Sequence, residues 1–215
     1  MARAIRNRSH SRRRIAGGML FFLLGGTAAA GLSLARQPQR PVATAASVAP
    51  ADRIAVPESS AREALAQGLI DRPIKSILNV PARMRYGDYR WNDEGVPPGP
   101  TWIRVDLKAQ TISVFRAGHE IGTAVILYGA DGMPTPTGKF PILARIKDHH
   151  SATYDAPMPY TLRLTADGVS IHASDVRWGR ATHGCVGVPL TFAAKLFAAS
   201  TRCETVLIVD GAKRA

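Results

Sequence analysis

The chain has 215 residues, 46% of them hydrophobic, and a formal net charge of +12, so it accommodates one domain of ordinary size together with additional segments. Eight of its 28 basic residues lie within residues 1–40, which contain no acidic residue, and the rest of the chain holds 20 basic against 16 acidic residues. Because the basicity is concentrated at the N-terminus, the charge argues against a groove that binds nucleic acid. The eight residues are Arg3, Arg6, Arg8, Arg12, Arg13, Arg14, Arg36 and Arg40.

Residues 1–35 have the pattern of a helical export leader. Residues 1–14 are rich in arginine, and an apolar run over 15–35 ends with the small residues Ser33 and Ala35, which suit a signal-peptidase site. A cleaved signal peptide and an uncleaved inner-membrane anchor both fit, since the run has roughly the 20 residues that a bilayer requires. Either interpretation predicts export to the periplasm or cell envelope.

A linker and a short lead-in follow the leader. Residues 36–57 are rich in Pro, Ala and Thr without a hydrophobic period, which predicts a disordered linker. Ser60 and Glu63 form a capping-box pattern, which predicts that a short helix begins there. The rest of the segment up to residue 94 is rich in turn residues.

The pattern then changes to short strands over a domain that we expect to span residues 95–212. Alternating apolar residues predict strands at 101–107, on both sides of an Ala-Gly turn in 111–129, at 133–148, and in a hairpin over 161–174 with its turn at Asp167 and Gly168. One helix, capped by Thr191, is expected over 190–201, and a buried strand is expected to begin at Cys203. The fold class is therefore mostly β with one or two short helices.

The segment 181–189, "ATHGCVGVP", places a cysteine between two glycines and beside a histidine. A nucleophilic Cys185 needs a base to remove its proton, and His172 near the end of a predicted strand could serve as that base. The flanking glycines allow the backbone to approach a substrate closely, and N–H groups near Gly184 could stabilise an oxyanion. The motif therefore predicts acyl transfer through a thioester.

Three other interpretations of these residues stay open at this point. Cys185 could be a core thiol, or it could pair with Cys203 in an oxidising compartment, although we expect Cys203 to be a small core residue. A zinc site is a further alternative because the donor types are present, but they lack tight ligand spacing. Its ligands would come from His149, His150, His172, His183 and Cys185.

The motif and its surroundings resemble the L,D-transpeptidase catalytic domain (YkuD-type) of bacterial peptidoglycan enzymes. The resemblance rests on Thr-His-Gly-Cys with an upstream strand histidine, and on "PTPTGKFPIL", "DAPMPYTLRLTADGVSIHAS" and the hairpin that begins "WIRVDL". These segments stand in the family's order over residues 100–210. The resemblance implies a β-sandwich-like or barrel-like fold and no metal or organic cofactor.

The resemblance also implies roles for the motif residues. Cys185 would be the nucleophile and His172 the proton acceptor and donor, while His183 and Thr182 would support the loop. The backbone N–H groups of Gly184 and Cys185 would form the oxyanion hole. The substrate would be the tetrapeptide stem of peptidoglycan, and an amine acceptor would then take the acyl group to form a 3–3 cross-link or to attach a protein.

One position departs from the family pattern, because Gly187 stands where members usually carry Arg or Asn. We expect Arg177 or Arg180 to supply the missing guanidinium, and Tyr160 and Trp178 to contact the substrate. The departure keeps two rival functions open, namely an L,D-carboxypeptidase that uses water as acceptor and a non-catalytic peptidoglycan-binding module. We expect a monomer whose partners are stem peptides and, if the leader is uncleaved, the inner membrane.

Overall fold

The computed structural model describes residues 52–211. The predicted leader, 1–35, and residues 36–51 of the predicted linker lie outside this range. Within 52–211, no helix has the length and apolar character that crossing a membrane would require.

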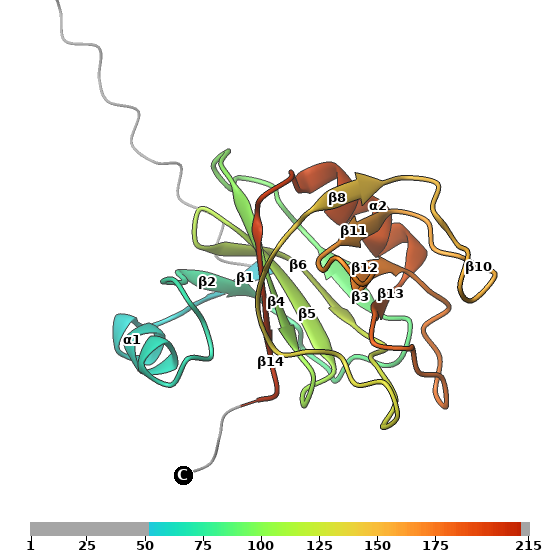
Figure 1. The fold of residues 1–215 in the computed structure, drawn as a ribbon. Coiled ribbons are helices and arrows are strands. Elements are labelled where there is room, and N and C mark those ends of the chain that lie inside the picture. The colour runs from blue at the N-terminus through green and yellow to red at the C-terminus, as the bar shows by residue number, and fades with distance from the viewer. Residues whose placement is uncertain (1–51, 212–215) are drawn as a thin grey trace, which may run out of the picture. The chain divides into compact units, whose positions relative to one another are not determined.

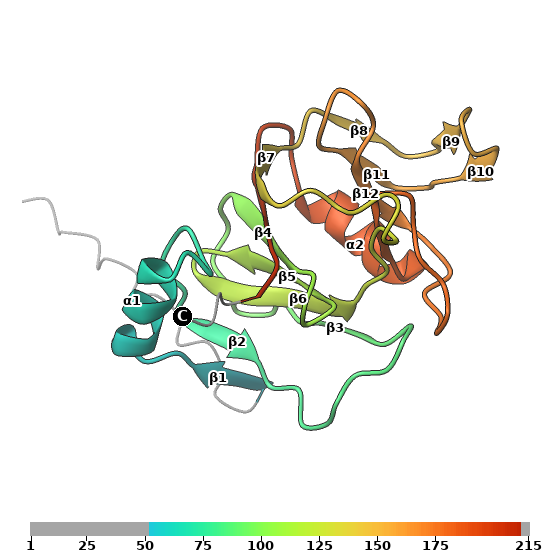
Figure 2. The same ribbon diagram turned by 60° about the horizontal axis from the view of Figure 1, so that its bottom comes forward.

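A large mixed sheet forms the centre of the described part (Figures 1 and 2). Its order is β1-β2-β6-β5-β4-β14-β7, and β3 also pairs with β6. The continuous antiparallel path β4-β5-β6 follows from the two short turns that the alternating sequence predicts. The strands are β1 (Arg53–Ala55), β2 (Ser76–Leu78), β3 (Tyr89–Trp91), β4 (Thr101–Asp106), β5 (Thr111–Arg116), β6 (His119–Val125), β7 (Gly138–Pro141) and β14 (Thr205–Val209).

A second, four-stranded sheet carries the motif residues. Its order is β13-β12-β11-β8, and a separate hairpin of β9 and β10 projects beside it. The pair β11–β12 is the predicted hairpin around Asp167 and Gly168, whereas β12 and β13 run parallel. The strands are β8 (Ala144–Ile146), β9 (His150–Ser151), β10 (Ala156–Pro157), β11 (Thr161–Arg163), β12 (Ser170–Ala173) and β13 (Val186–Val188).

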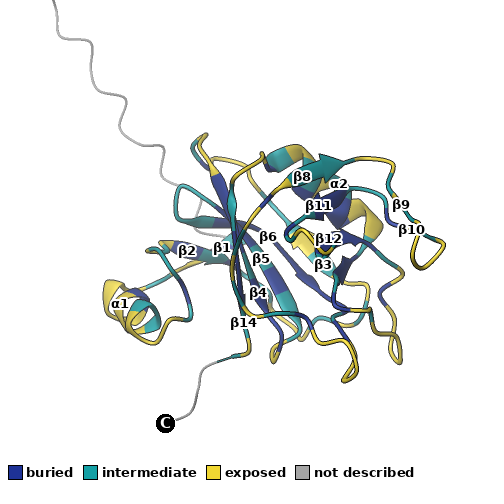
Figure 3. Cartoon of the chain, viewed as in Figure 1, coloured by how far each residue is buried: buried dark blue, intermediate teal, exposed yellow. Residues whose placement is uncertain are grey.

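Helix α2 (Leu190–Ala199) joins the two sheets into one core (Figure 3). Its apolar face buries Phe192, Ala193 and Leu196, and the helix contacts β11 and β12 on one side and β6 on the other. The Phe192 ring meets Trp91 edge-on, with 5.6 Å between ring centroids. The parallel pair β12–β13 is therefore backed by a packed helix, which holds the motif residues on a rigid support.

Both predicted helix caps are wrong. Helix α1 (Glu58–Ala66) begins after Pro57 and α2 begins after Pro189, and neither start has a side-chain cap hydrogen bond. Proline explains both starts, because its φ is already fixed near the helical value and it has no N–H to leave unsatisfied. Ser60 and Thr191 lie inside their helices instead of capping them.

Two other predicted features differ from the structure. The end of the predicted linker forms β1, which pairs with β2, and the buried Arg53 also donates to the backbone carbonyls of Glu120 and Asn92. Cys203 is exposed in a turn with φ +69°, and the following strand begins only at Thr205. Both Cys203 and Cys185 are free thiols, so the structure gives no support to a disulfide.

Candidate active site

The loop that leads into β13 presents Cys185 beside β12. Gly184 has φ +94°, a backbone conformation that residues with side chains rarely adopt. The Cys185 carbonyl accepts hydrogen bonds from the hydroxyls of Thr182 at 2.5 Å and Thr135 at 3.4 Å. The loop conformation is thus held by a glycine turn and by two threonines that bind the same carbonyl.

Holding the Cys185 carbonyl in this way leaves the neighbouring amides available. Within residues 52–211, the backbone N–H groups of Gly184 and Cys185 donate to no protein acceptor. Amide N–H groups without a partner beside a thiol are the donors that an oxyanion hole requires.

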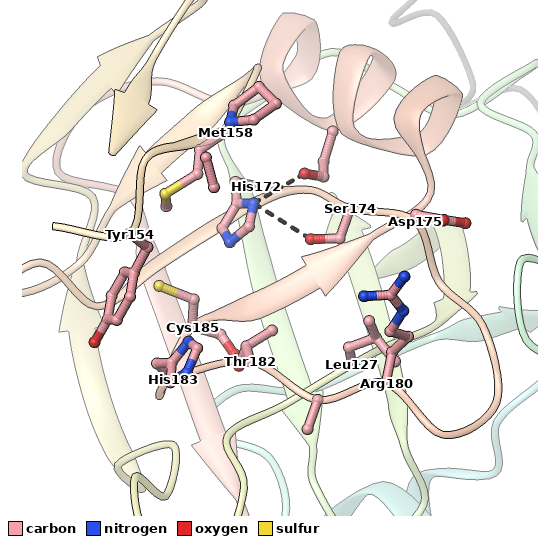
Figure 4. Close-up of a pocket in the computed structure, with 14 residues that line it drawn as sticks. Leu127, Tyr154, Met158, His172, Ser174, Asp175, Arg180, Thr182, His183 and Cys185 are labelled. Atoms are coloured by element: carbon pink, nitrogen blue, oxygen red, sulfur yellow. Dashed lines mark hydrogen bonds between the residues drawn. The ribbon is translucent and has the colours of Figure 1, made fainter. Parts of the chain in front are cut away.

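His172 is buried in β12 with its tautomer set by the backbone. Its Nδ1 lies 2.9 Å from the carbonyl of Ala173 and 3.4 Å from the Ser174 hydroxyl. A carbonyl only accepts hydrogen bonds, so Nδ1 carries the proton and the neutral ring keeps Nε2 as its acceptor nitrogen. Figure 4 shows this ring and the Cys185 sulfur facing the same cavity.

The surroundings of both groups favour their neutral forms. Burial lowers the pKa of His172, and the hydrogen bond to Ala173 offsets that effect only partly. Burial also raises the pKa of Cys185, whose thiol lies 3.8 Å from the Gly168 carbonyl, and a backbone hydrogen bond from Ser170 opposes this effect in part. Both shifts therefore favour a neutral thiol and a neutral imidazole over an ion pair.

A cavity of about 450 Å³ holds the motif residues together. Cys185, His172, Thr182, His183 and Arg180 all line it. Five of the residues singled out from the sequence, drawn from β12 and the loop after it, therefore meet in one cavity.

Two supporting residues are placed differently from each other. The His183 ring is exposed and stacks on Tyr154 of the β9–β10 hairpin, with 4.4 Å between ring centroids and 10° between planes. The stack ties the hairpin to the loop that bears the thiol. Thr182 instead points inward to the Cys185 carbonyl.

Three residues expected to contact substrate do not line this cavity. Arg177 forms an ion pair with Asp175 on the surface. Trp178 is 83% exposed and meets Tyr86 edge-on. Tyr160 packs its ring against Phe197 of α2.

The structure also explains why a residue without a side chain stands at position 187. Gly187 pairs with His172 in the β12–β13 register. A Cβ atom at Gly187 would lie 2.6 Å from Ser174 Oγ and 2.8 Å from Ser174 Cβ, which is closer than real Cβ atoms approach. The Ser174 side chain therefore occupies the space that a side chain at 187 would need.

Sequence reasoning missed the contributions of Thr135, Ser174 and Gly168. Thr135 is buried, and its hydroxyl bridges the Gly129 N–H and the Cys185 carbonyl. Its position 50 residues before the cysteine gives no local signal, although the notable "PTPTG" run contains it. Among the residues described, no three His, Cys, Asp or Glu side chains are gathered as a metal site would require, which leaves the zinc alternative without support.

The family model of the L,D-transpeptidase catalytic domain, YkuD, matches residues 100–208. Solved L,D-transpeptidases from Stackebrandtia nassauensis and Mycobacterium tuberculosis (L,D-transpeptidase 1) are 24% and 25% identical, with TM-scores of 0.48 and 0.44. A cysteine-to-serine mutant of the Enterococcus faecium L,D-transpeptidase is 26% identical, with a TM-score of 0.47.

These similarities cover parts of each chain. The matches include 54%, 51% and 52% of this chain, and 58%, 62% and 50% of the Stackebrandtia, Mycobacterium and Enterococcus chains. A search among curated proteins gave no match.

Proposed function

This chain belongs to the family of L,D-transpeptidase catalytic domains, and from that premise we propose that it is an exported cysteine acyltransferase that acts on peptidoglycan stem peptides. One observation carries the proposal. A thiol flanked by glycines, Cys185, shares a cavity with the neutral imidazole of His172, whose Nε2 is the acceptor nitrogen. The arginine-rich leader supports a place in the cell envelope, and we propose no metal or organic cofactor.

In the first half-reaction, the thiol is acylated. His172 Nε2 accepts the proton of Cys185 while Sγ attacks the carbonyl carbon at the L-centre of the stem's third residue. The oxyanion points at the N–H groups of Gly184 and Cys185, and a donor of this kind contributes about 3 kcal/mol. The C–N bond to the terminal D-alanine then breaks, the imidazolium returns its proton to the leaving amine, and a thioester remains.

In the second half-reaction, an amine of an acceptor stem resolves the thioester. His172 accepts a proton from the attacking amine, the C–S bond breaks, and the thiolate of Cys185 is protonated again. The product is a 3–3 cross-link, or an attached protein if the amine belongs to one. Because burial favours the neutral form of both groups, we propose that proton transfer accompanies the attack on the carbonyl rather than preceding it.

Arg180 is the residue that we propose for binding the substrate carboxylate. It lines the cavity with His172, whereas Arg177 is already paired with Asp175. The leaving D-alanine carries an amine and a carboxylate on one carbon, and the amine must lie at His172. A guanidinium in the same cavity is suited to the carboxylate, and a charge-assisted hydrogen bond of this kind contributes roughly 1.5–3 kcal/mol.

This assignment has a matched control within one loop. Arg180→Ala should lower kcat/KM for D-alanine release by about tenfold or more. Arg177→Ala should leave it within twofold of the wild type. Equal effects of the two substitutions would contradict a specific role for Arg180.

Hydrolysis on the same residues is a second candidate, and Gly187 is the observation that favours it. A site without the usual side chain at that position offers fewer contacts to an acceptor amine, which leaves water as the competing nucleophile. Both candidates share the acyl-enzyme at Cys185 and differ only in the second half-reaction.

Incubation with purified disaccharide-tetrapeptides tests the function directly. Transpeptidation predicts a 3–3 linked dimer together with free D-alanine, and hydrolysis predicts tripeptide and D-alanine without dimer. Neither product should form with Cys185→Ala. Intact tetrapeptide after prolonged incubation with the wild-type protein would contradict both candidates and leave a non-catalytic binding module.

A further inference from the structure

Two surface turns of the described chain carry the same residue pattern. Residues 85–88 read Arg-Tyr-Gly-Asp, and residues 177–180 read Arg-Trp-Gly-Arg. In each turn the N–H of the fourth residue donates to the carbonyl of the first, at 2.9 and 3.3 Å, and the third residue is a glycine with φ of +91° and +75°. A β-turn with positive φ at its third residue favours glycine there, and its second residue lies at the tip. Each turn therefore presents one aromatic ring, Tyr86 in the first and Trp178 in the second.

The two turns lie side by side, and their rings form a corner. The ring centroids of Tyr86 and Trp178 are 5.7 Å apart, with 71° between the planes. A Cβ atom at Gly87 would lie 3.5 Å from the carbonyl oxygen of Val176, a buried residue just before the second turn. The Tyr86 hydroxyl donates to Gln110 Oε1 at 3.0 Å, which fixes the first ring. The aromatic corner is thus formed by the fold itself, before any ligand binds.

The fold leaves the ring of Trp178 open to solvent. Trp178 is 83% exposed, the highest exposed fraction among the large hydrophobic residues within 52–211. Trp102 is 3% exposed, and Trp91 packs against Phe192. An aromatic ring that is held in place and yet left in water is typical of a binding surface, because tryptophan contributes a large apolar area to a contact. Trp178 therefore indicates a ligand that stacks on its face.

The groups around the corner are polar hydrogen-bond donors. Arg85 begins the first turn and Arg180 ends the second, both are exposed, and neither forms an ion pair within residues 52–211. A pyranose ring presents C–H groups on its faces and hydroxyl or acetamido oxygens around its edge. A flat apolar face beside guanidinium donors is complementary to such a ring. A lipid chain or an apolar helix would need a wider apolar surface than one aromatic corner offers.

The corner lies at the rim of the cavity that contains His172. Arg180 lines that cavity and stands two residues after Trp178, so their Cα atoms are at most about 7 Å apart. Given the proposed function, an acceptor stem places its amine at His172 and is joined through its N-terminus to a sugar of a glycan strand. Two residues separate the third residue of the stem from that sugar, a span of roughly 7 Å when extended. The strand that bears the acceptor stem is therefore within reach of the corner.

We propose that Trp178 and Tyr86 form a saccharide-binding site, in which an N-acetylated amino sugar of a glycan strand stacks on Trp178. Arg85 donates to the oxygen atoms at the edge of the sugar ring. The site lies outside the cavity and takes no part in acyl transfer; it holds the strand while the stem reaches the thiol. The choice of ligand rests on the proposed function, whereas the aromatic corner does not.

Isothermal titration calorimetry with a tetramer of N-acetylglucosamine tests the site without any reaction. This probe carries the acetamido sugars of a glycan strand but no peptide and no free carboxylate. The wild-type protein should bind it, and Trp178→Ala should bind at least about tenfold more weakly, as loss of an aromatic anchor predicts. Leu143→Ala is the matched control, because it removes another exposed apolar side chain that belongs to neither turn, and its affinity should equal that of the wild type.

The outcomes separate this inference from the proposed function. No binding of the tetramer by the wild type at millimolar concentrations, or equal affinity of Trp178→Ala, overturns the saccharide site. Dimerisation of the wild type that Trp178→Ala abolishes, measured by sedimentation without saccharide, would assign the corner to a second copy of the chain and also overturn it. Tetramer binding without D-alanine release from disaccharide-tetrapeptides contradicts the proposed function alone, and release without tetramer binding contradicts the saccharide site alone.

Discussion

Gly187→Ala is a small substitution that tests how the site is packed. The added Cβ would lie 2.6 Å from Ser174 Oγ, 2.8 Å from Ser174 Cβ and 3.4 Å from Leu127 Cβ. Backbone hydrogen bonds between Gly187 and Leu127, both 2.9 Å, hold the strand on its other side. Movement of the strand away from Ser174 would press it against Leu127 and stretch the 2.8 Å hydrogen bond from the Ser174 N–H to the Val188 carbonyl. The strain therefore reaches His172, which pairs with Gly187.

Overpacking of this kind costs about 1–3 kcal/mol of the free energy of unfolding. With a urea m-value of roughly 2 kcal/mol/M, a loss of about 2 kcal/mol lowers the unfolding midpoint by about 1 M. Urea unfolding followed by circular dichroism measures this shift. Thiol acylation by a carbapenem should slow in parallel, because the strain acts on His172 through its pairing with Gly187.

Ser174→Gly supplies the rescue, since it removes both of the closest atoms. The double variant should recover at least half of the lost stability, which corresponds to a coupling energy of about 1 kcal/mol or more. Gly132→Ala is the control, because a Cβ there meets no atom within 4 Å. An unchanged midpoint for Gly187→Ala, or a double variant no more stable than the single one, would refute the packing argument.

Three further predictions concern protonation and support of the loop. Burial raises the pKa of Cys185 and lowers that of His172. The rate at which iodoacetamide alkylates Cys185 should therefore keep rising with pH up to and beyond the ordinary thiol pKa of about 8.5. A fast rate that is already constant below pH 7 would reveal an ion pair instead. Thr135→Val removes one donor to the Cys185 carbonyl. It should lower the free energy of unfolding, measured in urea, by about 1 kcal/mol and slow acylation of Cys185 by a carbapenem. An unchanged free energy of unfolding and an unchanged acylation rate would show that Thr135 does not support the loop. Burial raises the pKa of Glu120, so the stability it contributes is present below the unfolded pKa of about 4.3 and is lost as the pH rises. Glu120→Gln keeps an acceptor for the Leu78 N–H, so its free energy of unfolding should rise relative to that of the wild type between pH 4 and pH 8. A difference between the two proteins that stays constant over this pH range would contradict the prediction.

Elements that depend on local pattern were predictable from the sequence. The hairpin of β11 and β12 follows from alternating residues around Asp167 and Gly168, and it forms as expected. The N-cap of α1 is Pro57, three residues before the predicted cap at Ser60, because the fixed φ of Pro57 outweighs the capping pattern. Local signals thus place elements better than they place element ends.

Features that depend on distant contacts were not predictable. The sequence around Arg53 predicts a linker, because the carbonyls that Arg53 binds belong to Glu120 and Asn92, which are distant in the sequence. The sequence also offers Arg177 and Arg180 as equivalent candidates, and only the fold separates them, because Asp175 pairs with Arg177.

The protonation states of the site were equally hidden from the sequence. A histidine near a cysteine suggests an ion pair, yet burial of His172 and Cys185 favours the neutral forms. Burial is a property of the whole packed core, which includes α2, and no local motif encodes it.

The central claim is that Cys185 is the nucleophile, and mass spectrometry of the protein after exposure to a carbapenem tests it most directly. Opening of the β-lactam ring releases no leaving group, so the adduct should add the full mass of the drug. The wild type and Cys203→Ala should gain this mass on a peptide that contains Cys185, and Cys185→Ala should gain none. An adduct that persists in Cys185→Ala, or that maps to any other residue, would contradict the account.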